Sequence, residues 1–361
     1  MELKVAKITP WKVRCGIATY SENLASALGK EGVDVYIVRL PRFGPKTKEI
    51  VLDVADRVPK DKVDCIHVQH EYGLYQGFER DFYGYLQTLG LPIVTTMHAI
   101  GNWQIDGGIF SISKKVIVHN EFCARKLEFP STIIPHGCSP VKCPPMDECK
   151  KSFGIDPRVK VVGYVGFIST YKGLETLFAA MTKITNAGVL IGGGWHTTGP
   201  ETQYIVQLKQ HSMQVLGDRC KWLGYVPDET LNRVYGTMDL IVYPSKFSTE
   251  SGALLTAISH GKAVIASNVP PFREKEKQGA LMIFKDVDDL TRKIKKLLKN
   301  DELRHELEEG ARNYAESVSW NKIAQKHIEL YESLIADKDD FNRIKPASQG
   351  TVDTLQAEPN P

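Results

Sequence analysis

The sequence predicts an α/β protein built from two doubly wound domains that face each other across a cleft. Short apolar runs with β-branched residues alternate with amphipathic stretches of helical length along almost the whole chain. The polar, proline-bearing stretch at residues 139–156 divides this pattern into two series. A chain of 361 residues is also long enough for two such domains, each with a core of its own.

The first series is expected to contain strands at residues 5–8, 33–40, 65–69, 92–97, 115–119 and 131–134. The second is expected to contain strands at residues 160–165, 188–192, 220–223, 240–243 and 263–266. Amphipathic stretches at 16–29 and 320–336 are two of the expected helices. Strands that alternate with helices form parallel sheets covered by helices. Ligands of such sheets bind beyond the carboxyl ends of the strands, which places them here in the cleft.

Composition narrows the class of protein. Apolar content of 42% and charged content of 25% are typical of a soluble globular protein. A net charge of +3 is too small to indicate a nucleic-acid partner. No run of about 18 apolar residues is present, the first residues lack a signal-peptide layout, and the seven scattered cysteines are typical of reduced thiols. We expect a cytoplasmic protein, with peripheral contact at the inner membrane face left open.

The stretch around Ser251 is the strongest candidate for a phosphate site. The expected strand at 240–243 stops at Pro244, a polar loop follows, and Gly252 begins the apolar helix that Ala253 continues. Such a turn directs free backbone N–H groups and the positive end of the helix dipole at one point. A point of this kind binds phosphate, although an ordinary βαβ unit with a well-capped helix has the same pattern.

The loop PWKVRCGIATY after the first expected strand is a second candidate. Gly16 lies at the helix start, where the backbone can approach a phosphate or simply pack against the sheet. Lys12 and Arg14 are cations of the same loop that can meet an anionic ligand. The loop is not the G-x-G-x-x-G fingerprint, and no acidic residue closes the second strand. The absence of these two features disfavours a nicotinamide oxidoreductase, although it excludes no fold. We expect no cofactor.

Polar residues also follow two further strands of the first series. His70, Glu71 and Tyr72 come at the end of the third expected strand, and His98 ends the fourth. Side chains of this kind at strand exits are typical of a site more than of a core. In the second series, Lys172 lies in the turn GFISTYKG, where it can hold the charge of a departing diphosphate or remain a solvated lysine.

Four segments together carry a family resemblance: CGIATY, HVQHEYG with TTMHAI, GFISTYKG, and SGALLTAISHGKAVIAS. In this order and spacing the chain resembles the retaining nucleotide-sugar glycosyltransferases of glycosyltransferase family 4, also called group 1. The resemblance covers about residues 3–335. It implies the GT-B architecture, in which two facing Rossmann-like, doubly wound domains enclose a cleft.

The resemblance also implies a domain plan. Residues 1–142 form the acceptor domain and residues 150–317 the nucleotide-sugar donor domain. A C-terminal helix at 318–337 packs back on the first domain, and residues 338–361 are expected to be a disordered tail.

Residue roles follow from the same resemblance. His98 lies at the reaction centre, Lys172 binds the diphosphate, and Glu250 holds hydroxyls of the donor. The expected donor contacts are Gly16, Ser251, Gly252 and Ala253, and the acceptor or cleft candidates are Arg14, His70, Glu71 and Tyr72.

The chain departs from the family pattern at two positions. Phe167 stands where the family usually has an arginine, and Thr256 replaces one of its paired glutamates, with Glu250 near the place of the other. One cationic phosphate ligand is therefore missing. Arg14, Lys12 or Lys246 are the available cations that can replace it.

The function implied is retaining transfer of a hexose, mannose or glucose, from a nucleotide-diphosphate sugar to the hydroxyl of a glycan, lipid or small-molecule acceptor. No D-x-D motif lies at a strand end, so no essential metal is expected. A sugar-nucleotide epimerase on the same fold is an alternative, with Glu71 and Glu250 as the carboxylates to test. A pyridoxal-type phosphorylase lacks a clear Schiff-base lysine, whereas a non-catalytic nucleotide-sugar binding protein remains a third reading.

Overall fold

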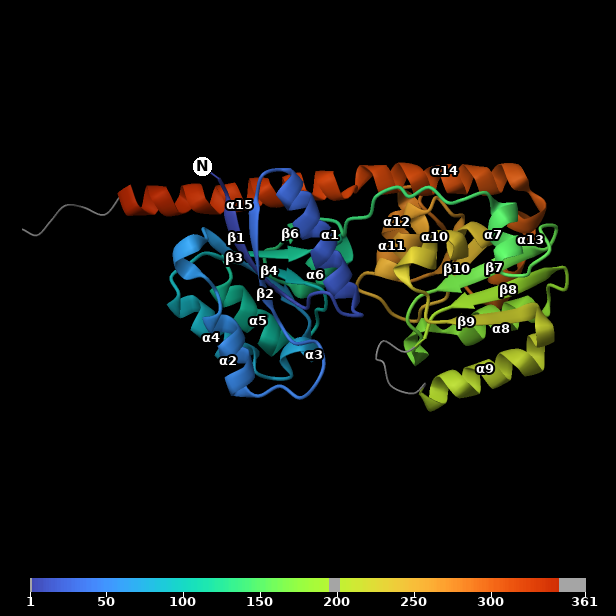
Figure 1. Cartoon of the computed structure of the whole chain (residues 1–361), viewed down its shortest axis with the longest axis horizontal. Helices are drawn as coiled ribbons and strands as arrows, with labels where there is room; N and C mark the ends of the chain where they lie inside the picture. Colours follow the sequence, from blue (N-terminus) through green and yellow to red (C-terminus); the bar gives the residue numbers. More distant parts are fainter. Residues whose placement is uncertain (1, 195–201, 344–361) are drawn as a thin grey trace, which may run out of the picture.

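The chain forms two α/β domains, each with a parallel sheet of six strands at its centre (Figure 1). The structure is a computed structural model and describes residues 2–194 and 202–343. The predicted fold class, two doubly wound α/β domains, is confirmed.

The N-terminal sheet has the strand order β2-β1-β3-β4-β5-β6. Its strands are β1 (Lys4–Thr9), β2 (Asp34–Arg39), β3 (Cys65–His70), β4 (Ile93–Met97), β5 (Lys115–Val118) and β6 (Thr132–Ile133). The helices of this domain are α1 (Gly16–Lys30), α2 (Lys48–Asp56), α3 (Tyr72–Tyr75), α4 (Glu79–Thr88), α5 (Trp103–Ile112) and α6 (Glu121–Leu127).

The C-terminal sheet has the order β12-β11-β10-β7-β8-β9. Its strands are β7 (Lys160–Val165), β8 (Ala187–Gly192), β9 (Cys220–Gly224), β10 (Leu240–Tyr243), β11 (Val264–Ser267) and β12 (Met282–Phe284). The helices are α7 (Met146–Ser152), α8 (Leu174–Thr182), α9 (Gln203–Leu216), α10 (Asp228–Thr237), α11 (Gly252–Ser259), α12 (Pro270–Lys277), α13 (Val287–Lys299) and α14 (Asp301–Ser317). Sequence analysis missed β12, because three residues are too few to show a period.

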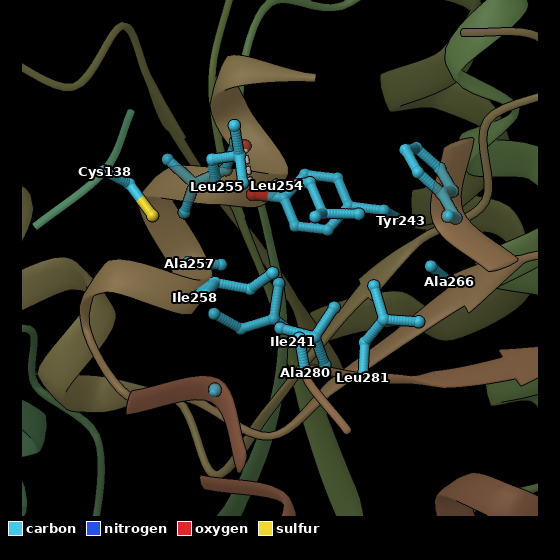
Figure 2. Close-up of a cluster of buried hydrophobic side chains, with 14 of the residues drawn as sticks. Cys138, Ile241, Tyr243, Leu254, Leu255, Ala257, Ile258, Ala266, Ala280 and Leu281 are labelled. Atoms are coloured by element: carbon cyan, nitrogen blue, oxygen red, sulfur yellow. Dashed lines mark hydrogen bonds between the residues drawn. The ribbon is translucent and has the colours of Figure 1, made fainter. Parts of the chain in front are cut away.

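The apolar face of α11 anchors the second domain. Figure 2 shows Leu254, Leu255 and Ile258 of this helix packed together with Ile241 of β10 and Leu281. All five side chains are buried. Because burial of such side chains stabilises by about 1.5–3 kcal/mol each, the start of α11 is held firmly against the sheet.

The chain crosses between the domains twice, and the two crossings meet. The amide of Cys138 donates to the carbonyl of Val318 (3.1 Å), and the amide of Trp320 donates to Ser139 Oγ (3.1 Å). After the second crossing, α15 (Trp320–Arg343) runs back along the N-terminal domain and packs against α1 (Figure 1).

Helix α15 is described to Arg343, which is beyond residue 338, the expected start of the disordered tail. Residues 344–361 of that tail lie outside the described residues. Among the helices that the structure describes, none combines the length and the apolar character that a bilayer crossing requires. All seven cysteines are free thiols.

Candidate active site

The topology of the two sheets determines which loops meet at the domain interface. Strand order reverses between β1 and β3 in the first sheet and between β7 and β10 in the second. Loops that leave neighbouring strands on either side of such a point diverge to opposite faces, and the gap between them is where α/β sheets bind ligands. The segments singled out in the sequence follow β1, β3, β7 and β10, so the topology places them at these two points.

The N-terminus of α11 presents unpaired backbone donors. Ser251 caps the helix, and its Oγ accepts a hydrogen bond from Leu254 N (3.3 Å). The amides of Gly252 and Ala253 precede the first turn and have no acceptor within the helix. Gly252 is exposed. A Cβ added there would have one described neighbour within 4 Å, His136 Nε2 at 3.8 Å. These donors and the helix dipole can bind an anion.

Glycines let the neighbouring loops approach this helix closely. Gly166 after β7 has φ +152, and its carbonyl oxygen lies 1.9 Å from the position of a Cβ built on Gly193. Gly173 has φ +67, and a Cβ there would lie 2.4 Å from the carbonyl oxygen of Pro244. A side chain at either Gly193 or Gly173 would therefore separate loops that now touch.

Lys172 lies beside the loop that leads into α11. It ends a short 3-10 turn at Thr170–Lys172, and its Nζ lies 4.6 Å from the ring centroid of Tyr171. The amide of Lys246 donates to Tyr171 O at 2.7 Å, which joins this turn to the loop after β10. Within the described residues no carboxylate pairs with the Lys172 ammonium, so its charge is available to a ligand.

On the N-terminal side, three histidines gather around Tyr20. The rings of His98, His119 and His136 lie 5.0, 5.3 and 4.9 Å from the Tyr20 ring centroid. They come from the ends of β4, β5 and β6, and we call them the histidine cluster. Sequence analysis put His98 at the reaction centre but gave His119 and His136 no role there.

The orientation of the His98 ring is fixed by a hydrogen bond to Gln69. His98 Nε2 lies 2.9 Å from Gln69 Oε1, and Gln69 Nε2 in turn lies 3.0 Å from His67 Nε2. His67 Nδ1 lies 2.6 Å from the hydroxyl of Tyr331 on α15. An amide oxygen only accepts, so His98 donates its Nε2–H to Gln69. A chain of buried polar side chains thus joins α15 to the site.

Burial keeps the histidine cluster neutral. Desolvation, followed by the neighbouring histidines His119 and His136, holds the pKa of His98 well below its usual value. Burial likewise lowers the pKa of His136 to about 4. Neutral imidazoles can orient hydroxyl groups of a sugar by hydrogen bonds, since each ring carries one donor and one acceptor.

Glu250 is held by protein groups on both carboxylate oxygens. Its Oε2 accepts from Lys275 Nζ (2.8 Å) and its Oε1 from Ser251 N (2.8 Å), and the two ionic side chains are 8% and 3% exposed. Burial by itself raises the pKa of Glu250, but the Lys275 ammonium, His136 and the amide of Ser251 together leave that pKa lowered. Glu250 therefore fixes the loop before α11, a role that sequence analysis did not assign. Lys275 on α12 was also missed.

The acceptor candidates do not share one environment. Arg14 is exposed and its guanidinium carbon lies 3.9 Å from the ring centroid of Tyr225, in the other domain. Glu71 and Tyr72 are half-buried, and the Tyr72 hydroxyl donates to Asp106 Oδ1 at 2.6 Å. Gly16 is exposed at the start of α1, where a Cβ would meet nothing within 4 Å.

His70 is a correction to the sequence prediction. Its side chain is fully buried and stacks on Tyr75 with 5.2 Å between ring centroids. Among the described residues, neither ring nitrogen has a hydrogen-bond partner. Strand β3 is buried on both faces, so a residue at its end can point into the core as readily as out of it. In this structure the ring of His70 faces the core and not the gap between the domains.

Direct contacts join the two sides of the site. Thr249 Oγ1 donates to the carbonyl of His98 (2.9 Å), and Asn120 Nδ2 donates to the carbonyl of Thr249 (2.7 Å). The carboxylate of Glu274 accepts from the amides of Glu121 and Phe122, the first residues of α6, at 3.1 and 2.8 Å. The predicted reaction-centre histidine therefore lies in contact with the loop that precedes α11.

Two Rossmann-like domains with their ligand-binding edges turned toward each other define the GT-B class of proteins. Residues 145–314 match the family model described as glycosyl transferases group 1. This match covers most of the C-terminal domain.

Similarity to known proteins agrees with this class. The chain is 29% identical over 199 residues to a D-inositol 3-phosphate glycosyltransferase of Corynebacterium jeikeium, covering 52% of this chain and 47% of that protein. It is 30% identical over 170 residues to the lipopolysaccharide core biosynthesis mannosyltransferase LpsB of Rhizobium meliloti, covering 44% of this chain and 46% of that protein. The matches thus span about half the length of these curated relatives.

Similarity of structure extends over both domains. HepE of Anabaena, solved in complex with UDP and glucose, superposes with a TM-score of 0.75 at 16% identity. The match covers 92% of this chain and all of that one. At this identity the likeness establishes the fold alone.

Proposed function

We propose that the protein is a retaining glycosyltransferase of family 4 that moves a hexose, mannose or glucose, from a nucleotide-diphosphate sugar to an acceptor hydroxyl. The observation that carries this proposal is the contact between the Ser251-capped start of α11 and the histidine cluster. Free amides and a cationic Lys172 lie on one side, and neutral imidazoles lie on the other. This arrangement supports a diphosphate site next to a sugar site.

Each side of the interface has a task in this mechanism. Departure of the diphosphate creates negative charge, which the amides of Gly252 and Ala253 and the Lys172 ammonium would stabilise. His98, held by Gln69, would orient the sugar so that the acceptor hydroxyl attacks the anomeric carbon. The acceptor would approach from the N-terminal domain, near Glu71 and Tyr72. Contact between the domains would exclude water and suppress hydrolysis.

The proposal needs no metal, because the amides and Lys172 supply positive potential where the charge develops. Activity is then expected to persist in EDTA. The relatives support the donor class only as analogy: HepE is described with UDP and glucose, and LpsB as a mannosyltransferase. We place the donor on the C-terminal domain (150–317) and the acceptor on the N-terminal domain (1–142).

The epimerase alternative requires Glu71 and Glu250 to face the sugar. Because Glu250 is paired with Lys275 and Ser251 instead, we do not favour it. A non-catalytic nucleotide-sugar binding protein differs from a transferase only in turnover, so the experiment below includes that readout.

The test is thermal stabilisation of the full chain by a panel of nucleoside diphosphates and nucleotide sugars. A ligand that binds the folded state raises the midpoint of unfolding in proportion to its affinity. One nucleotide should stabilise the wild type, Lys172→Ala should weaken the effect, and Lys295→Ala, at an exposed lysine of α13, should leave it unchanged. Absence of any shift would remove the donor site. Binding without transfer to any acceptor would favour the non-catalytic alternative.

A further inference from the structure

A second concave site lies on the C-terminal domain, at the opposite end of α11 from Ser251. It is a cavity of about 310 Å³ between the interdomain linker, the turn after α11, and α14. The linker is fixed there by a hydrogen bond from Val141 N to the carbonyl of Ser259 (2.7 Å). Nothing in the proposed transfer reaction uses this cavity.

Cations dominate its lining. Lys142, Lys262, Arg304 and Arg312 contribute four positive charges, whereas Glu308 is the one carboxylate among the described lining residues. The carboxylate of Glu308 is in contact with His305, with 3.0 Å between Nδ1 of the histidine and Oε2 of the glutamate. The cavity therefore has an excess of positive charge.

Two of the cations are buried without full compensation. Lys262 is 7% exposed, and no described residue forms a hydrogen bond or an ion pair with its Nζ. Arg304 is also 7% exposed, and its Nη1 pairs with Asp301 Oδ1 at 2.6 Å. Its Nε has no hydrogen-bond partner among the described residues and lies 3.9 Å from Glu308 Oε1. Keeping the Lys262 ammonium at a buried position without a counter-charge is costly, so the folded chain gains stability if an anion pairs with it.

Burial also lowers the pKa of Lys262, and the neighbouring Cys143, Glu308 and Asp239 offset only part of that effect. The direction agrees with an ammonium that lacks a counter-ion. An anion in the cavity would raise the pKa of Lys262 again.

We propose that this cavity, which we call the anion pocket, binds a small phosphate-bearing anion. Arginine and lysine together match phosphate well, since guanidinium groups bind two oxygens at once and ammonium groups add charge. Arg312 and Lys142 are exposed and can receive the anion from solvent, while Lys262 neutralises it inside. The volume suits inorganic phosphate or a small phosphomonoester more than a nucleotide sugar.

Calorimetric titration of the full chain with inorganic phosphate, and separately with glycerol 3-phosphate, tests the proposal. Arg312→Gln should weaken binding about tenfold or more, the loss expected for one charge-assisted contact. Lys295→Ala, at the exposed lysine of α13, should leave this binding unchanged. Tighter binding of glycerol 3-phosphate would identify a phosphomonoester as the ligand, and equal binding would identify free phosphate.

Two results would overturn the anion pocket. One is that neither anion binds the wild type; the other is that Lys172→Ala abolishes the binding and Arg312→Gln does not. Lys262→Met gives an independent readout. It should raise the thermal midpoint without phosphate and remove the phosphate-dependent rise, whereas a lower midpoint with phosphate binding retained contradicts the proposal.

Discussion

The two domains present different chemical groups at their common interface. The C-terminal domain offers backbone: the amides at the start of α11 and the loops packed through Gly166, Gly173 and Gly193, all above an apolar core. The N-terminal domain offers side chains: the histidine cluster above Gln69, His67 and the fully buried Lys7.

This difference predicts how strongly each domain constrains its residues. Backbone sites constrain residue type strongly, because a side chain on a glycine with positive φ and close neighbours is strained. The family model matches residues 145–314, which include these glycines. Side-chain networks can be rebuilt from other residues, so they constrain residue type less. The comparison yields the following predictions.

The largest expected effect separates a structural from a chemical role for Glu250. Glu250→Gln leaves the Lys275 ammonium buried without a counter-charge, which should cost about 3–5 kcal/mol of unfolding free energy in a urea titration. Adding Lys275→Met should recover most of that loss. A cost below about 1 kcal/mol together with complete loss of transfer would instead make Glu250 a substrate-binding residue.

Backbone packing in the C-terminal domain is tested by Gly193→Ala. The new Cβ would overlap the carbonyl oxygen of Gly166, so we expect a loss of about 3 kcal/mol or more and loss of nucleotide binding. The control is Gly217→Ala, where φ is +57 but no atom lies within 4 Å of the Cβ, and the cost should be about 1–2 kcal/mol. Equal costs would show that the loops can separate freely.

Lys7 tests the side-chain network of the N-terminal domain. Burial lowers its pKa to about 7, and its Nζ, 5.5 Å from the ring centroid of Tyr20, has no hydrogen-bond partner among the described residues. The pKa of Lys7 in the folded state lies below its pKa in the unfolded chain. The charged ammonium therefore destabilises the folded state fully below pH 7, and this cost disappears as the pH rises toward about 10.4.

Lys7→Met should therefore stabilise the protein on the order of 2–4 kcal/mol at pH 6 and by much less at pH 10. Urea titrations at both pH values measure this. Lys4→Met, on the same strand but partly exposed, should change stability by less than about 1 kcal/mol at either pH. A destabilised Lys7→Met at pH 6 would contradict an unpaired ammonium.

The smallest effect concerns the positioning of His98. Gln69→Leu removes the acceptor for its Nε2–H, and we expect kcat to fall about tenfold with the donor KM little changed. Gln87→Leu, at an exposed glutamine of α4, is the control. In Gln69→Glu a carboxylate would face His98 and raise its pKa, so the pH–rate profile should shift upward. An unshifted profile would mean that Gln69 is only structural.

Local pattern determined much of this protein. Alternating apolar runs and helical stretches predicted the two doubly wound sheets, because hydrophobic periodicity follows directly from the geometry of strands and helices. The capped start of α11 was also predictable, since Ser251 and Gly252 are adjacent in sequence and the signal is local.

Tertiary structure decided the partners. Glu250, in the loop before α11, forms a hydrogen bond with Lys275 on α12. His67 forms one with Tyr331, which is 264 residues away in the chain. No period or motif encodes such pairs, because only the packing of separate elements brings them together. His70 shows the same limit, as the pleat of a doubly buried strand does not say which end residue faces the core. The sequence therefore determined the sheets and their loops, while packing selected which side chains face the site.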